Sequence, residues 1–105
     1  IIANLSASDE YVSKAQYRRE LVANQSARCV CAYVYSGASV FESTTDLVFS
    51  GATLVCENGT VLSEGERFKR ENVLTVADVD VERLLSQRRS NMSFENSNIK
   101  QNALN

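Results

Sequence analysis

The chain alternates between short runs of apolar residues and polar connections, and the period of each run predicts an element. Runs that are apolar throughout, or that alternate with a period of two, are typical of strands. Strands are predicted on this basis at Ile1–Leu5, Cys29–Tyr35, Ala52–Glu57, Thr60–Glu64 and Val73–Val79, with a further short one at Leu47–Phe49. The first two lack alternation, so they are expected to be buried on both faces. Asn58-Gly59, between two of the other strands, predicts a tight type I′ hairpin.

The segment Lys14–Arg28 predicts a helix. Ser13 and Gln16 lie at its start with the spacing of a capping box, in which each side chain binds the backbone of the other residue. Apolar side chains recur along the segment and are expected to form its buried stripe, at Ala15, Tyr17, Leu21 and Val22. Arg18 and Arg19 are expected to face water, with a phosphate site as the alternative for this pair.

A second helix is predicted at Val81–Asn91, with Asp80 as its N-cap residue. The order strand–helix–strand, hairpin, strand–helix indicates a mixed α/β (α+β) domain with helices packed at one side of a sheet. A buried first strand needs neighbours on both sides, so the chain is expected to be the C-terminal part of a larger domain. Residues 1–94 are assigned to that domain, and the polar, Asn-rich residues 95–105 to a tail or linker.

Composition limits the functions that the chain can carry out. It has 105 residues, enough for one small core, and a formal net charge of −2, which offers no basic surface to nucleic acid. No apolar run approaches the ~18 residues of a membrane span, so no membrane partner is expected. His is absent, and no metal site is expected. Cys29, Cys31 and Cys56 lack the spacing of a disulfide framework or a zinc site, so they are expected to be free, mostly buried thiols in a reducing, cytoplasmic setting.

Two stretches place polar residues where ligands are often bound. Ser6 and Ser8 follow the first strand and Lys14 begins the next helix, so hydroxyls and a cation meet where α/β folds gather their ligands. Turn-forming hydroxyls and a solvated lysine would explain the same residues without a ligand. The second stretch, Glu42–Asp46, is equally compatible with a catalytic loop, a self-satisfied turn and a subunit contact.

Several motifs resemble those of known enzymes. Phe49–Thr53 and Glu57–Leu62 resemble the F-x-G-x-S…G-x-[VI]-[IL] hairpin of the nitrilase superfamily of carbon–nitrogen hydrolases. A more specific set resembles, in order and spacing, the glutaminase domain of the glutamine-dependent NAD⁺ synthetases. That set comprises NLSAS (Asn4–Ser8), YRRELV (Tyr17–Val22), SARC (Ser26–Cys29), AYVY (Ala32–Tyr35), ESTTDLVFSG (Glu42–Gly51) and ERF (Glu66–Phe68). The resemblance covers roughly residues 1–94 and implies the C-terminal portion of a nitrilase-like αββα sandwich.

This family implies a glutaminase reaction that supplies ammonia to a ligase. A Glu-Lys-Cys triad hydrolyses the side-chain amide of L-glutamine, with Cys as nucleophile, Glu as general base and Lys at the oxyanion. The ammonia travels to a separate C-terminal synthetase domain, where ATP with Mg²⁺ adenylates nicotinic acid adenine dinucleotide and ammonia displaces AMP to give NAD⁺. The implied partners are therefore L-glutamine and that synthetase domain, in an assembly expected to be a homo-oligomer.

The family's triad matches positions upstream of Asn4, so no catalytic residue is assigned in this chain. None of the three cysteines matches the nucleophile, and the chain by itself is expected to be inactive. Two positions do match the family's glutamine contacts, Ser8 and Lys14, which help to hold the α-amino and α-carboxylate ends of the substrate. Some members of the family carry Arg at the second position.

Two alternatives stay open on sequence alone. The chain could be a segment of a stand-alone nitrilase-type amidase, or of a non-catalytic assembly module with the same fold. The flanking sequence in the gene distinguishes them, because a synthetase adds the triad upstream and a pyrophosphate-binding SGGxDS-type loop downstream.

Overall fold

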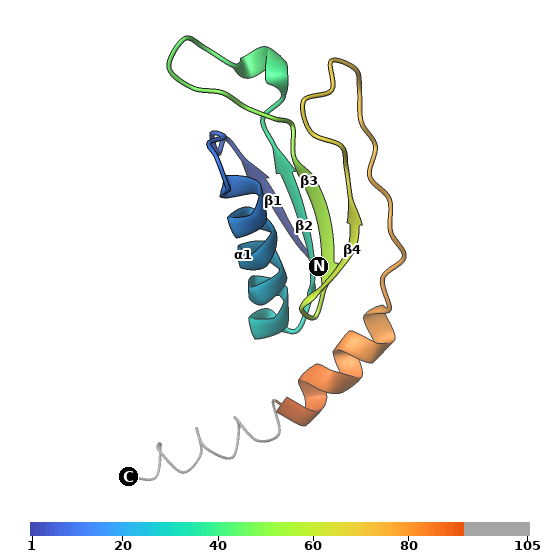
Figure 1. The fold of residues 1–105 in the computed structure, drawn as a ribbon. Coiled ribbons are helices and arrows are strands. Elements are labelled where there is room, and N and C mark those ends of the chain that lie inside the picture. The colour runs from blue at the N-terminus through green and yellow to red at the C-terminus, as the bar shows by residue number, and fades with distance from the viewer. Residues whose placement is uncertain (92–105) are drawn as a thin grey trace, which may run out of the picture.

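A four-stranded mixed sheet with a helix on one face forms the body of the protein (Figure 1). The computed structural model describes residues 1–91. The elements in chain order are β1 (Ile2–Ser6), α1 (Lys14–Cys29), β2 (Ala32–Gly37), the 3₁₀ helix η1 (Val40–Glu42), β3 (Thr53–Glu57) and β4 (Thr60–Glu64), followed by a helix over residues 81–91. The predicted mixed α/β class is confirmed. The predicted polar tail lies outside the described residues.

The strands lie side by side in sequence order, β1-β2-β3-β4. β1 and β2 are parallel and α1 forms the crossover between them, whereas the β2–β3 and β3–β4 pairs are antiparallel. Asn58 and Gly59 have φ values of 45° and 92°. Positive φ at both central residues is what a type I′ turn requires, so the predicted hairpin is confirmed.

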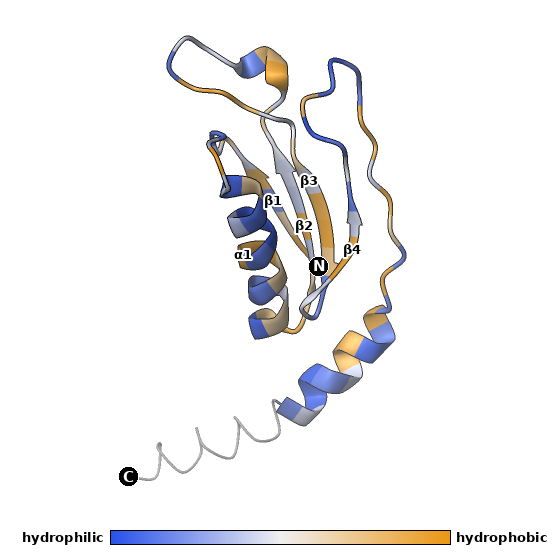
Figure 2. Ribbon diagram, viewed as in Figure 1, coloured by the Kyte–Doolittle hydropathy of each residue, from blue (hydrophilic) through white to orange (hydrophobic). Residues whose placement is uncertain are grey.

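The core lies between α1 and the sheet. Its buried members are Val22, Tyr35, Ala52, Leu54 and Cys56, with Ala23, Tyr33 and Val61 packed against them. The buried stripe of α1 consists of Arg18, Val22 and Ser26, which recur every fourth residue. Tyr17 and Leu21 are instead 59% and 54% exposed, so the predicted apolar stripe is wrong at these two positions, and Arg18 does not face water. Figure 2 shows the mixture of polar and apolar residues along α1 that hid this stripe.

The two helix starts differ in how their first turns are capped. Ser13 precedes α1 with a φ of 71°, and its side chain makes no cap hydrogen bond. Gln16 Nε2 donates to Glu20 Oε1 at 3.0 Å instead of turning back to the helix start, so the predicted capping box is wrong. The predicted cap of the second helix is confirmed, because Arg83 N donates to Asp80 Oδ1 at 3.0 Å.

The end of α1 explains why the strand predicted from Cys29 begins only at Ala32. Val30 has a φ of 47°, and its N–H donates to the carbonyl of Ala27 at 3.2 Å. A β-branched residue rarely adopts this left-handed conformation, so the apolar pattern alone predicted a strand here. The helix therefore extends to Cys29, one residue beyond the predicted end.

Residues 47–49 do not form the short strand that was predicted. Side-chain hydroxyls accept the backbone N–H groups of this segment. Leu47 N donates to Thr44 Oγ1 at 3.1 Å, and Phe49 N donates to Ser43 Oγ at 3.0 Å. These contacts favour the self-satisfied turn among the three possibilities left open for Glu42–Asp46.

The predicted strand Val73–Val79 is extended but does not pair with the sheet. It crosses the face opposite α1, where the hydroxyls of Thr75 and Thr53 lie 2.6 Å apart. Thr75, Ala77 and Val79 are half-buried and alternate with exposed residues, so one side of the segment packs on the sheet. Because the segment lies over a face of the sheet and not along an edge, it shows the alternating burial of a strand without backbone hydrogen bonds to a neighbouring strand.

β1 forms within one residue of its predicted bounds, but it is not a buried strand in the described part of the protein. It is an edge strand paired only with β2, and Ile1 and Leu5 are 78% and 86% exposed. The expectation that the segment associates with further protein stays a prediction, which these exposed side chains support.

Ser26 joins α1 to the β3–β4 hairpin, and its replacement tests this contact. The side chain is fully buried; Oγ donates to the carbonyl of Ala23 at 2.7 Å and accepts from Gly59 N at 2.8 Å. Ser26→Ala leaves the Gly59 N–H without an acceptor, so we expect the free energy of unfolding to fall by about 1–3 kcal/mol. Urea unfolding measures the change, with the exposed Asn24→Ala as control. Equal stability of wild type and Ser26→Ala would contradict this account.

Candidate functional site

A pocket of about 340 Å³ lies between β1 and one side of α1. It is lined by Asn4, Ser6, Ser8, Lys14, Tyr17, Arg18, Leu21, Val22, Gln25, Tyr33 and Tyr35. Ser8 and Lys14 are both among these residues, so the structure brings the two predicted ligand-binding positions to one site. Their binding of glutamine stays a prediction.

The end of β1 supplies the polar side of this pocket. Alternate side chains of a strand share a face, so Asn4 and Ser6 lie on the side of the sheet that also carries Tyr33 and Tyr35. Asn4 Nδ2 donates to Tyr33 Oη at 2.8 Å. Ala38 N donates to the carbonyl of Ser6 at 2.9 Å and extends the β1–β2 pairing to the point where the chain turns toward Ser8.

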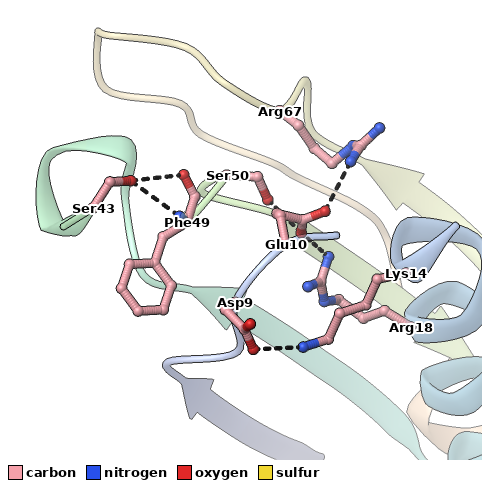
Figure 3. Close-up of polar contacts among 8 residues, drawn as sticks. All are labelled: Asp9, Glu10, Lys14, Arg18, Ser43, Phe49, Ser50 and Arg67. Atoms are coloured by element: carbon pink, nitrogen blue, oxygen red, sulfur yellow. Dashed lines mark hydrogen bonds and ion pairs between the residues drawn. The ribbon is translucent and has the colours of Figure 1, made fainter. Parts of the chain in front are cut away.

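Lys14 lines the pocket, and its side chain is 14% exposed. Its Nζ binds Asp9 Oδ1 at 2.9 Å (Figure 3). The same Nζ lies 4.9 Å from the centroid of the Tyr11 ring. The hydrogen bond from Lys14 holds the pKa of Asp9 below its ordinary value of 3.8. An ammonium group has three donors, so Lys14 can bind Asp9 and a ligand carboxylate together.

Glu10 lies in the same connection with a side chain only 6% exposed, and it binds three other segments (Figure 3). Its Oε1 accepts from Ser50 Oγ at 2.7 Å and forms an ion pair with Nη1 of Arg18. Its Oε2 pairs with Nη1 of Arg67 at 3.0 Å. Burial acts to raise the pKa of Glu10, but the Ser50 hydrogen bond and the two arginines outweigh it, so this pKa lies below its ordinary value of 4.5.

Arg18 connects this ion pair to the pocket, because it lines the pocket and is only 5% exposed. Its guanidinium carbon lies 5.9 Å from the centroid of the Tyr35 ring, a cation–π contact between two residues that line the pocket. Its Nε is buried and has no hydrogen-bond partner within residues 1–91. The buried charge of Arg18 is therefore compensated by one carboxylate and one aromatic face.

Sequence reasoning missed Glu10 and Arg18 as parts of this site. Glu10 lies in a polar connection without periodicity, and Arg18 adjoins Arg19, whose pairing with Glu64 on the surface fits a solvated helix face. The available signal was the spacing of Arg18, Val22 and Ser26, which places all three on one side of a helix.

Two of the three cysteines lack the properties of nucleophiles in this fold. Cys31 and Cys56 are 3% and 0% exposed, and burial raises the pKa of both thiols, so they stay protonated at neutral pH. Cys29 accepts a hydrogen bond from Gln25. Within residues 1–91, no three His, Cys, Asp or Glu side chains are grouped as metal ligands, and neither helix has the length and apolar character to cross a membrane.

The lowered pKa of Glu10 makes a prediction about acid stability. A carboxyl whose folded pKa is depressed stabilises the fold above its unfolded value, and this contribution is lost as pH falls through the folded pKa. We therefore expect wild-type stability to fall as pH drops below about 4.5, and Glu10→Gln to flatten that dependence while lowering stability at pH 7. Urea unfolding at a series of pH values measures both effects, and an unchanged pH profile in Glu10→Gln would show that the ion pair does not stabilise the fold.

Comparison with known proteins relates the chain to one enzyme class. No protein-family model matches the sequence. The chain is 45% identical over 97 residues to the glutamine-dependent NAD(+) synthetase of Mycobacterium tuberculosis, covering 92% of this chain and 14% of that protein. For the enzyme of the same name from Mycobacterium leprae, the identity is 43% over 104 residues, covering 99% of this chain and 15% of the relative.

Comparison with solved structures relates the fold to the same enzyme class. The crystal structure of a glutamine-dependent NAD(+) synthetase from Cytophaga hutchinsonii matches with a TM-score of 0.65 and 29% identity, covering 73% of this chain and 14% of that chain. Our chain thus spans a small fraction of the length of the proteins it matches. In sequence and in fold, it is related to one segment of the glutamine-dependent NAD(+) synthetases.

Proposed function

We propose that the chain forms the C-terminal part of the glutaminase domain of a cytoplasmic glutamine-dependent NAD⁺ synthetase, where it binds the amino-acid end of L-glutamine. The observation that carries this proposal is the position of Ser8 and Lys14 in one pocket. The 45% identity over 92% of the chain supports it. In this proposal residues 1–94 belong to the glutaminase domain, and residues 95–105 lead away from it.

The chemistry of the pocket suits a free amino acid. The Ser8 hydroxyl can accept a hydrogen bond from an α-ammonium group, and the Lys14 ammonium can donate to an α-carboxylate. The small side chain at position 8 lets the ligand approach the backbone closely. The triad that breaks the amide bond lies in sequence outside this chain, and the ammonia is consumed in a synthetase domain that uses ATP and Mg²⁺.

Lys14 is expected to act on binding and not on the chemical step. The α-carboxylate of glutamine keeps its charge while the side-chain amide is attacked, so its contact with Lys14 has nearly equal strength in the ground state and in the transition state. Such uniform binding changes KM and leaves kcat nearly unaltered.

Replacing Lys14 in the full-length enzyme tests this role. A charge-assisted hydrogen bond contributes ~1.5–3 kcal/mol, so Lys14→Ala is expected to raise the KM for glutamine roughly 10- to 150-fold, with a smaller fall in kcat. NAD⁺ formation from free ammonia should change little, because ammonia bypasses the glutaminase pocket. Lys14→Arg should retain function, since arginine carries the same charge.

Lys69→Ala is the matched control, because Lys69 forms an exposed ion pair with Glu66 away from the pocket. The assay is NAD⁺ formation with glutamine and with ammonia, side by side, on all four proteins. Equal losses with both nitrogen sources in Lys14→Ala would mean that Lys14 has only a structural role.

The isolated chain is expected to release no ammonia from L-glutamine, because the proposed triad lies outside it. A coupled glutamate or ammonia assay on the purified chain checks this. Turnover that persists when Cys29, Cys31 and Cys56 are replaced in turn would place the reaction at residues that we have not identified.

The gene itself tests the assignment to a synthetase. We expect codons for a Glu-Lys-Cys triad upstream of this segment and for an SGGxDS-type pyrophosphate loop downstream. A triad without the loop would indicate a stand-alone amidase, and a gene without the triad would indicate an assembly module.

A further inference from the structure

The carboxylate of Glu10 binds three parts of the fold that are distant from one another in sequence. Arg18 belongs to α1, Ser50 precedes β3, and Arg67 lies in the turn after β4. The last two segments are also tied to each other, since Phe68 N donates to the carbonyl of Ser50 at 2.7 Å. Glu10 therefore attaches its own segment to two others, those of Ser50 and Arg67, that are also hydrogen-bonded to each other.

The connection between β1 and α1, residues 7–13, depends on Glu10 for its long-range attachment. The backbone N–H of Glu10 donates to the carbonyl of Val48 at 2.6 Å, and the Glu10 carboxylate binds Arg18, Ser50 and Arg67. Within residues 1–91, every other hydrogen bond or ion pair of the connection is local, such as those of Asp9 with Lys14 and of Tyr11 with Lys14. Val12 is 91% exposed and makes no packing contribution that could replace Glu10.

Both residues proposed to bind glutamine lie close to this attachment. Ser8 precedes Glu10 by two residues, and Lys14 follows it by four. Arg18, the helix partner of Glu10, lines the same pocket as both of them. A shift of Glu10 would therefore move the ligand-binding side chains at both ends of the connection.

We propose that Glu10 is a positioning residue for glutamine binding: through Arg18, Ser50 and Arg67 it holds residues 7–13 so that Ser8 and Lys14 face the pocket. This inference rests on the proposed function. Glu10 does not line the pocket, so it acts through its neighbours and not by contact with the substrate.

Both the negative charge and the shape of the Glu10 side chain are required to hold residues 7–13 in place. Removing one partner of a buried ion pair leaves the other charge uncompensated, and the structure then relaxes to bring that charge to water. In Glu10→Gln, Arg18 is the buried group left uncompensated, and because it lines the pocket, its movement toward water would change the pocket. Displacements of about 1 Å in a binding site can change rates roughly 100-fold.

Glu10→Gln in the full-length enzyme tests the inference. We expect the KM for glutamine to rise roughly 10- to 100-fold, whereas ammonia-dependent NAD⁺ formation stays within about twofold of wild type. Glu64→Gln is the matched control. Glu64 of β4 pairs at 3.1 Å with Arg19, which belongs to α1 like Arg18, but Glu64 is exposed and does not line the pocket. This control should leave both activities unchanged.

A second variant guards against loss of folding. Glu10→Asp keeps a negative charge beside Arg18 and leaves every pocket-lining residue unchanged, but its side chain is one methylene shorter. It should fold and synthesise NAD⁺ from ammonia, yet raise the KM for glutamine, because the shorter carboxylate cannot reach Arg18, Ser50 and Arg67 together. A wild-type KM in either folded variant overturns the inference.

The outcomes separate the inference from the proposed function. If Lys14→Ala raises the glutamine KM but the Glu10 variants do not, Glu10 is structural and the proposed function stands. If the wild-type enzyme shows no glutamine-dependent NAD⁺ formation, both are overturned.

Discussion

A carboxylate removed from water must be surrounded by cations and hydrogen-bond donors. The buried carboxylate of Glu10 therefore requires several separate segments of the fold to bring their donors to one place. Its donors come from α1, from the turn before β3 and from the turn after β4. These segments are far apart in sequence and meet only if the helix, the sheet and both turns take their observed places. Satisfying one buried charge therefore fixes the relative positions of the elements around the pocket.

The same requirement explains why the inner stripe of α1 is largely polar. Arg18 must turn inward to reach Glu10, and Ser26 turns inward to bind the hairpin through Gly59, which leaves Val22 as the apolar residue between them. The helix thus packs on the sheet through Val22, with Ala23 beside it, and a polar contact lies on either side. The polar contacts fix its register on the sheet more specifically than apolar packing would, because each has one partner and one geometry.

Local chemistry made part of this structure predictable. Asn58-Gly59 determines its own turn, Asp80 caps its own helix, and the alternation of Thr60–Glu64 matches an observed strand. The failures depend on distant partners instead. Arg18 is buried because of Glu10, and 73–79 packs over a face of the sheet that no local pattern reveals. Ser8 and Lys14 could be singled out only through the family resemblance, since hydroxyls and a lysine in a turn have ordinary structural explanations.

A crystal structure of the full-length protein with L-glutamine bound tests the central claim most directly. The account predicts the α-carboxylate within hydrogen-bond distance of Lys14 Nζ, the α-ammonium at Ser8 Oγ, and Glu10 still bound to Ser50 and Arg67. Glutamine bound in another part of the protein, or in this pocket without contact to either Ser8 or Lys14, would contradict it.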